Sequence, residues 1–133
     1  GLATFGKSVA IDPNQAKTYS FWGLTLAKLG RHKEAIDKYE NALLLDPQSS
    51  NGYTYWGAAL GQLDKHEQAV EKLKKALELN PYNEMANGIL VDSYFHLGQF
   101  EDAWQAVKDA EKVKLTIPEG TLKRLRNVSP EPG

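Results

Sequence analysis

The sequence predicts an all-α fold in which antiparallel helix pairs stack into an α-solenoid, because its residues repeat with a period of 34. Three prolines mark this period, since Pro13, Pro47 and Pro81 are each 34 residues apart and each follows an apolar helical run. Proline suits that place because it cannot continue a helix and its fixed φ opens a turn. Alanine and leucine residues keep the same register in three further columns: Ala35, Ala69 and Ala103; Ala42, Ala76 and Ala110; Leu29, Leu63 and Leu97.

Aromatic and glycine residues add three more columns to the pattern. The matching pairs are Tyr19 and Tyr53, Trp22 and Trp56, and Gly23 and Gly57. The order of these residues, followed by the alanines and the proline, resembles the tetratricopeptide repeat (TPR) family over roughly residues 1 to 115. The resemblance implies a right-handed TPR superhelix of two-helix repeats. Asn87, Val91 and Leu115 depart from the pattern, as residues of an end repeat commonly do.

The repeats divide one predicted domain into six parts. These are a leading half repeat (1–15), three full repeats (16–49, 50–83 and 84–117), a C-terminal capping helix (118–128) and a disordered tail (129–133). We expect the first helix of each full repeat, the A helix, at 16–29, 50–63 and 84–97. We expect the second, the B helix, at 33–46, 67–80 and 101–114.

Small residues are expected to let the two helices of a repeat approach closely, through Gly23 with Ala35 and Gly57 with Ala69. The turn between the helices favours a left-handed residue. Gly30 provides it in the first repeat, and Asp64 takes that place in the second at a modest cost.

Composition and charge exclude several classes of function. The chain has 133 residues, 41% hydrophobic and 25% charged, and a net charge of −1. This balance gives no field to recruit nucleic acid or an anionic membrane, and no apolar run approaches the roughly 20 residues that span a bilayer. We therefore expect a soluble protein with no nucleic-acid partner and no membrane insertion, the cytoplasm slightly favoured. Because the chain starts at Gly1, we expect a processed form or a fragment.

Residues that carry catalytic or metal chemistry do not converge in the sequence. His32 and His66 lie 34 apart in inter-helix turns, where we expect them to face solvent. Asp92 and His96 share one face of a helix, either as a solvated pair or as a contact for a partner's polar group. A single Asp-His pair makes neither a zinc site nor a catalytic triad. There is no cysteine and no glycine-rich phosphate loop, so we predict no enzyme, no metal and no cofactor.

The basic run 72–75 is interpreted as a solvated helix face. Glu71 lies four residues before Lys75, and Lys74 lies four residues before Glu78, so both lysines have a predicted helical partner. A nucleic-acid patch is the less favoured interpretation.

The resemblance implies a concave groove lined by the A helices, with ligand-facing columns between the packing columns. The predicted partner-binding residues are Lys17, Phe21, Leu24, Lys28, Asn51, Tyr55, Gln62, Met85, Ile89, Asp92, Phe95 and His96. The carboxylate clamp of co-chaperone members is absent, because its positions hold Ser20, Leu24, Tyr55, Met85 and Ile89. The asparagine ladder of sugar-transferase members is absent too, because its column holds Phe21, Tyr55 and Ile89.

We therefore expect a non-enzymatic scaffold or adaptor that binds a peptide or helix with apolar anchors in an apolar concave groove. One alternative is a recognition or regulatory arm of a larger enzyme whose catalytic domain is outside this chain. Another is that the chain's own C-terminal segment or the neighbouring repeats fill the groove. The half repeat carries Phe5 and Val9 without a first helix of its own, so we also expect a possible homodimer through this N-terminal edge.

Overall fold

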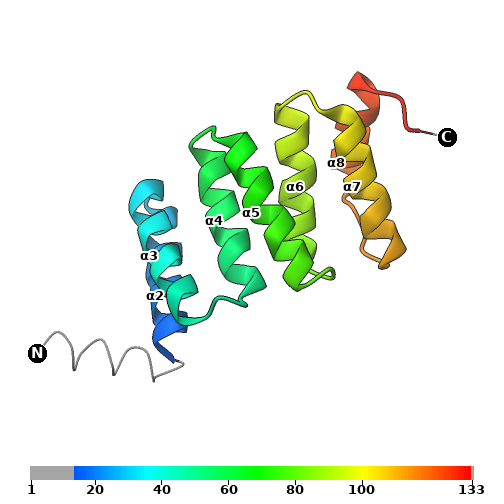
Figure 1. Ribbon diagram of the computed structural model, residues 1–133. Coiled ribbons are helices and arrows are strands. Elements are labelled where there is room, and N and C mark those ends of the chain that lie inside the picture. The colour runs from blue at the N-terminus through cyan, green and yellow to red at the C-terminus, as the bar shows by residue number, and fades with distance from the viewer. Residues whose placement is uncertain (1–13, 133) are drawn as a thin grey trace, which may run out of the picture.

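The computed structural model describes residues 14–132, which form α-helices joined by short turns, without a strand in that range (Figure 1). The helices are α2 (Asn14–Lys28), α3 (His32–Leu45), α4 (Ser50–Gln62), α5 (His66–Leu79), α6 (Glu84–His96), α7 (Phe100–Lys112) and α8 (Glu119–Val128). The predicted all-α fold is confirmed. Each of the six repeat helices begins and ends within two residues of its expected bounds. The expected half repeat, with Phe5 and Val9, lies outside the described residues.

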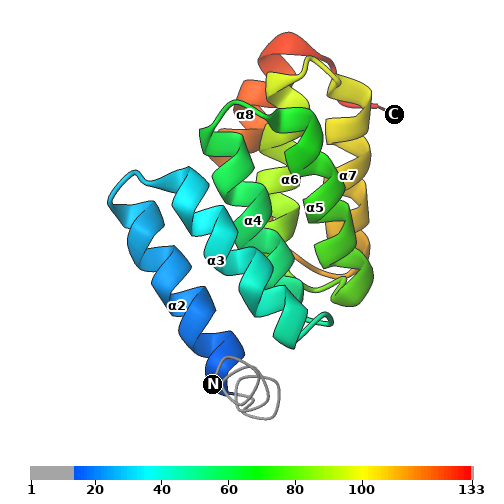
Figure 2. The same cartoon turned by 60° about the vertical axis from the view of Figure 1, so that its left-hand side comes forward.

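The helices stack side by side in chain order and alternate in direction. Figure 1 shows α2 and α3 at one end of the row and α7 and α8 at the other, and Figure 2 shows the same order from another side. Each helix packs mainly on the helices that precede and follow it in the chain, with weaker contacts from α4 to α2 and to α6. This nearest-neighbour packing is that of a solenoid.

Glycine in the A helices makes this packing close. A Cβ atom on Gly57 would lie 2.8 Å from Cγ of Leu73, and one on Gly23 would overlap the ring of Tyr39. Ala69, on the facing helix, is fully buried. The expectation that small residues bring paired helices together is therefore confirmed for both pairs.

Left-handed residues end the A helices as expected. Gly30 has φ 79° and Gly98 has φ 71°, while Asp64 adopts φ 61° in the matching position. In the turn at Asp64, the backbone N–H of Lys65 donates to the carbonyl of Leu60 at 2.9 Å, which satisfies an otherwise unpaired helix-terminal acceptor.

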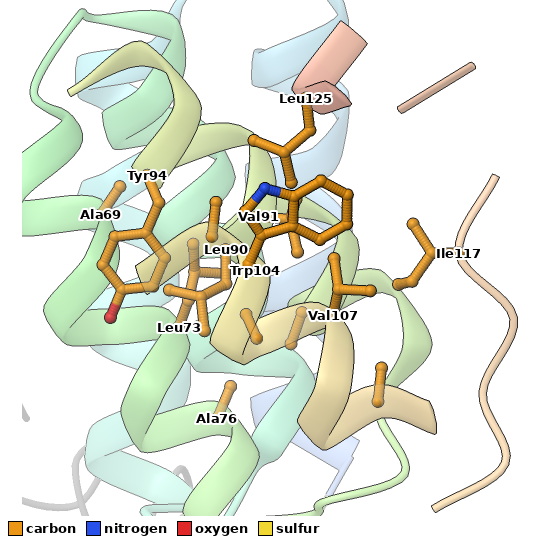
Figure 3. Packing of buried hydrophobic residues seen from close by; sticks show 14 of the residues in the cluster. Ala69, Leu73, Ala76, Leu90, Val91, Tyr94, Trp104, Val107, Ile117 and Leu125 are labelled. Carbon is orange, nitrogen blue, oxygen red and sulfur yellow. The ribbon is translucent and has the colours of Figure 1, made fainter. Parts of the chain in front are cut away.

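The largest core lies between the second and third repeats and continues to α8. Its bulkiest member is Trp104 of α7, which is buried beside Val91 of α6 and Leu125 of α8 (Figure 3). The indole Nε1 of Trp104 donates to the backbone carbonyl of Ser129 at 3.3 Å. Ile117 joins the same cluster from the segment before α8. Thus α8 covers the apolar side of the last repeat.

A polar network joins the second repeat to the third. Asn83 caps α6 by accepting the N–H of Ala86 at 3.1 Å. Its side-chain amide also donates to Ser50 Oγ at 2.9 Å, to Thr54 Oγ1 at 3.0 Å and to Asn51 Oδ1 at 3.3 Å, all on α4. One buried side chain therefore ties the start of α6 to the start of α4.

We predict that Ala69→Leu lowers the free energy of unfolding by roughly 1–3 kcal/mol, because the larger side chain overpacks the contact between α4 and α5. Denaturant unfolding followed by circular dichroism measures this change. Lys75→Leu is the control, since Lys75 is exposed on the same helix. An Ala69→Leu variant as stable as the wild type would contradict the helix register.

Candidate functional site

The A helices carry most of the predicted groove residues in matching stripes. On α2 the stripe follows a spacing of four, three and four residues, which keeps its members on one face of the helix. The same spacing recurs on α4 and α6. The stripes are Lys17, Phe21, Leu24 and Lys28; Asn51, Tyr55, Ala58 and Gln62; and Met85, Ile89, Asp92 and His96.

A depression of about 430 Å³ lies where the stripes of α2 and α4 face each other. Its lining is largely apolar, with polar groups that include Lys28 and Gln62. The lining residues are Leu24, Ala27, Lys28, His32, Tyr39, Tyr55, Ala58, Ala59, Gln62 and Met85. We call this depression the central pocket.

A second depression, of about 370 Å³, continues the central pocket toward the start of α2. Leu24 and Tyr55 line both, so the two form one continuous groove. Three further predicted residues, Lys17, Phe21 and Asn51, line this part.

A third depression, of about 360 Å³, lies between α4 and α6. Predicted residues in its lining are Gln62, Ile89, Asp92 and His96. Phe95 lines none of these three depressions. Its ring instead makes an edge contact with Phe100, with centroids 5.9 Å apart.

The C-terminal helix α8 occupies part of the third repeat's groove face. Arg124 Nη2 forms an ion pair with Asp92 Oδ1 at 2.9 Å, and its guanidinium carbon lies 5.0 Å from the centroid of Phe95. Asp92 also approaches His96, with Oδ2 3.4 Å from Nδ1. The alternative of a groove filled by the chain's own C-terminal segment therefore has support at the third repeat, and α8 contributes no lining residue to the central pocket.

Large apolar side chains are exposed along the groove. Phe21 is 73% exposed and Met85 is 49% exposed. Neither belongs to the buried clusters of the described chain. Their exposure leaves apolar surface for a partner to cover.

The expectation that the turn histidines face solvent is wrong. The side chain of His66 is only 14% exposed, because its ring stacks on that of His96 with centroids 4.7 Å apart. The Nδ1 atoms of His32 and His66 are both buried without a hydrogen-bond partner in the described part of the chain. These histidines are the first residues of α3 and α5, so they belong to helices and not to open turns.

The basic run on α5 exposes Lys74 and Lys75, as expected of a solvated face, but the predicted helical ion pairs are absent from the described contacts. No ion pair joins Glu71 to Lys75 or Lys74 to Glu78 in the described contacts. Lys72 is half-buried, with Nζ 4.1 Å from the ring centroid of Trp56. The matching residues of the first repeat, Lys38 and Trp22, make the same contact at 3.9 Å. These cation–π pairs repeat with the period of 34, which is the signal that could have revealed them.

Burial raises the pKa of Tyr39 to about 12, and the nearby Tyr55 adds to the rise. The two rings lie 5.8 Å apart at the wall of the central pocket. Tyr39 therefore remains neutral at physiological pH. The wall beside Leu24 accordingly carries no tyrosinate charge.

Residues 14–132 contain neither a metal-binding cluster nor a membrane-spanning helix. No group of three or more histidine, cysteine, aspartate or glutamate residues there could hold a metal ion. Among the helices of that range, none combines the length and the apolar character needed to cross a membrane.

Comparisons with other proteins identify relatives of this architecture. The sequence pattern described as tetratricopeptide repeat matches residues 16–49, and a second form of it matches residues 57–83. No protein with a curated description matches the chain significantly.

Solved structures share the fold. The first TPR domain of Spaghetti (RPAP3), bound to the HSP90 peptide SRMEEVD, superposes with a TM-score of 0.80 at 22% identity, covering 90% of this chain and 94% of that one. The Arabidopsis OM64 TPR domain gives 0.80 at 20% identity, covering 86% and 97%. The Sgt2 TPR domain of Aspergillus fumigatus gives 0.76 at 21% identity, covering 86% and 76%. The predicted TPR superhelix is therefore confirmed.

We predict that Tyr39→Phe reduces the loss of stability at high pH. The unfolded chain ionises Tyr39 near pH 10.0 and the folded chain near 12, so the folded state holds the proton more tightly. The stability that this difference contributes is complete below pH 10 and is lost as the pH rises through 12. Urea unfolding at about pH 9 and about pH 11 measures the loss.

The control for this prediction is Tyr82→Phe, because Tyr82 is an exposed tyrosine. Its removal should leave the alkaline loss of stability as large as in the wild type. Equal losses in the wild type and in Tyr39→Phe would show that Tyr39 ionises alike in the folded and unfolded chains.

Proposed function

The chain belongs to the tetratricopeptide repeat family, and we propose that it is a non-enzymatic scaffold or adaptor that holds a peptide or helix of a partner protein. The proposed binding surface is the concave groove of α2, α4 and α6. The observation that carries the proposal is the pair of adjoining depressions between α2 and α4, which share Leu24 and Tyr55 in their linings. A groove of this kind with apolar walls takes apolar anchors of an extended or helical segment.

Exposed side chains support this site because they have no packing role in the described chain. Phe21 and Met85 border the groove and lie outside the buried clusters. Burial of such side chains by a partner contributes roughly 1.5–3 kcal/mol each before the costs of association. A partner with a few apolar anchors therefore gains most of its affinity by covering these exposed side chains of the groove.

The partner proposed here differs from the ligand of the Spaghetti domain. That domain is bound to an HSP90 peptide. In this chain, the positions that match the family's carboxylate clamp hold Ser20, Leu24, Tyr55, Met85 and Ile89, none of which carries a positive charge. The groove accordingly favours apolar anchors over a free C-terminal carboxylate.

We predict that Phe21→Ala combined with Tyr55→Ala abolishes capture of the partner from a cell lysate while far-ultraviolet circular dichroism remains helical. Both side chains line the groove. Because the ring of Tyr55 also packs against that of Tyr39, Phe21→Ala with Met85→Ala serves as a second variant that removes exposed groups alone.

The matched control is Leu29→Ala with Leu44→Ala, which removes two exposed apolar side chains outside the groove. It should capture the same protein as the wild type. Capture that survives both groove variants would place the interface elsewhere, such as on the B helices.

We also predict that the peptide SRMEEVD shows no measurable affinity for this chain in isothermal titration calorimetry. The physical reason is that the clamp positions carry no cationic or amide side chain, so the carboxylates of the C-terminal aspartate have no charge-assisted hydrogen bonds at those positions. Binding of this peptide in the groove at micromolar concentration would contradict the proposed apolar specificity.

A further inference from the structure

Positive charge is concentrated at the α2 side of the groove. The first position of the three stripes holds Lys17, Asn51 and Met85, and the last position holds Lys28, Gln62 and His96. Between these positions the α2 stripe is apolar. The α2 stripe thus has a cation at each end of an apolar centre.

Both lysines are without a counterion among the described residues. Within residues 14–132, neither Lys17 nor Lys28 forms an ion pair. Asp46 lines the same depression as Lys17 but does not pair with it. In contrast, Asp92 on the α6 stripe already pairs with Arg124 of α8. The cationic side chains of the α2 stripe that remain available to a partner are therefore these two lysines, and Asp46 adds one carboxylate near Lys17 that is unpaired in the described chain.

The groove offers the backbone of an extended peptide a few polar side chains, such as Asn51 and Gln62, but no continuous ladder of them. Its walls are helices, whose main-chain donors and acceptors are used internally. The column that would carry side-chain amides for such a backbone instead holds Phe21, Tyr55 and Ile89. A helical partner satisfies its own backbone groups and needs apolar side-chain contacts, which these walls provide.

We propose that the partner segment is an amphipathic α-helix with two apolar residues at its centre and a carboxylate at each end of the same stripe. This proposal rests on the proposed function and specifies its partner. Lys17 and Lys28 are eleven residues apart, or roughly 16 Å along the helix axis at 1.5 Å per residue. A partner helix along α2 with carboxylates eleven residues apart places both beside lysines, and its apolar residues contact Phe21 and Leu24.

Three synthetic peptides of about 18 residues, rich in alanine for helicity, test the proposal. The first has leucine at positions i+4 and i+7 and glutamate at i and i+11. The second replaces both glutamates by lysine, and the third moves both glutamates to the opposite face without changing composition. Fluorescence anisotropy measures their affinity for the whole chain at low and high salt.

We expect the first peptide to bind more tightly than the third, by up to roughly fivefold for each lysine–glutamate pair at low salt. The second peptide should bind most weakly. High salt should reduce these differences, because it screens exposed charges. A first peptide that binds no better than the third would overturn the proposal.

Charge reversal in the protein provides the decisive comparison. Lys17→Glu with Lys28→Glu should make the second peptide the preferred one. The matched control, Lys33→Glu with Lys75→Glu, makes the same change in net charge at exposed positions on α3 and α5 and should keep the wild-type order. Unchanged preference in the groove variant would overturn the assignment of both lysines.

Failure of this inference is distinguishable from failure of the proposed function. If Phe21→Ala with Met85→Ala abolishes binding of all three peptides but charge has no effect, the groove is the binding surface and only the carboxylate specificity is wrong. If the peptides bind and that groove variant leaves their affinity unchanged, the peptides bind outside the groove and the proposed binding surface is wrong. If none of the peptides binds, the proposal of a helical partner is wrong. The capture experiment with the groove variants then tests the proposed function independently.

Discussion

The close approach of the two helices within a repeat is the contact on which the rest of the structure depends. Gly57 has no side chain where Leu73 packs, and Gly23 has none where Tyr39 packs. A larger residue at either glycine would separate the helix pair and shift the A helix against its neighbours. The groove is built from three A helices in register, so its continuity follows from these two glycines, although neither lines it.

Binding surface and core occupy largely different columns in this architecture, although Leu24, Tyr55 and Ile89 line the groove and also pack against the buried clusters. The core columns bury alanine and leucine between helices, while the groove columns vary from lysine to methionine without altering the stack. Helix α8 also contacts both, because Leu125 is buried in the core while Arg124 pairs with Asp92 of the α6 stripe. A single turn of this helix therefore contributes both to stability and to the shape of the groove.

The sequence predicted the helices and their pairing well because the 34-residue period sets both, and the left-handed conformation at Asp64 followed from its alignment with Gly30. Side-chain contacts between repeats were harder to predict. Stacking of His66 on His96 depends on how one repeat sits on the next, and no local spacing encodes that distance. The ion pair between Arg124 and Asp92 likewise depends on the docking of α8, which lies outside the 34-residue repeats.

The hydrogen bonds of Asn83 stabilise the boundary between the second and third repeats. The side-chain amide of Asn83 joins the α5–α6 turn to Ser50 and Thr54 of α4, so bending at that joint requires buried hydrogen bonds to break. The matching position of the preceding joint holds Ser49, whose hydroxyl accepts the N–H of Gly52 within its own helix. Among the described residues, the first and second repeats are therefore joined by packing without a matching set of side-chain hydrogen bonds. The central pocket spans that joint, so a change in the angle between the first two repeats would change the width of the pocket.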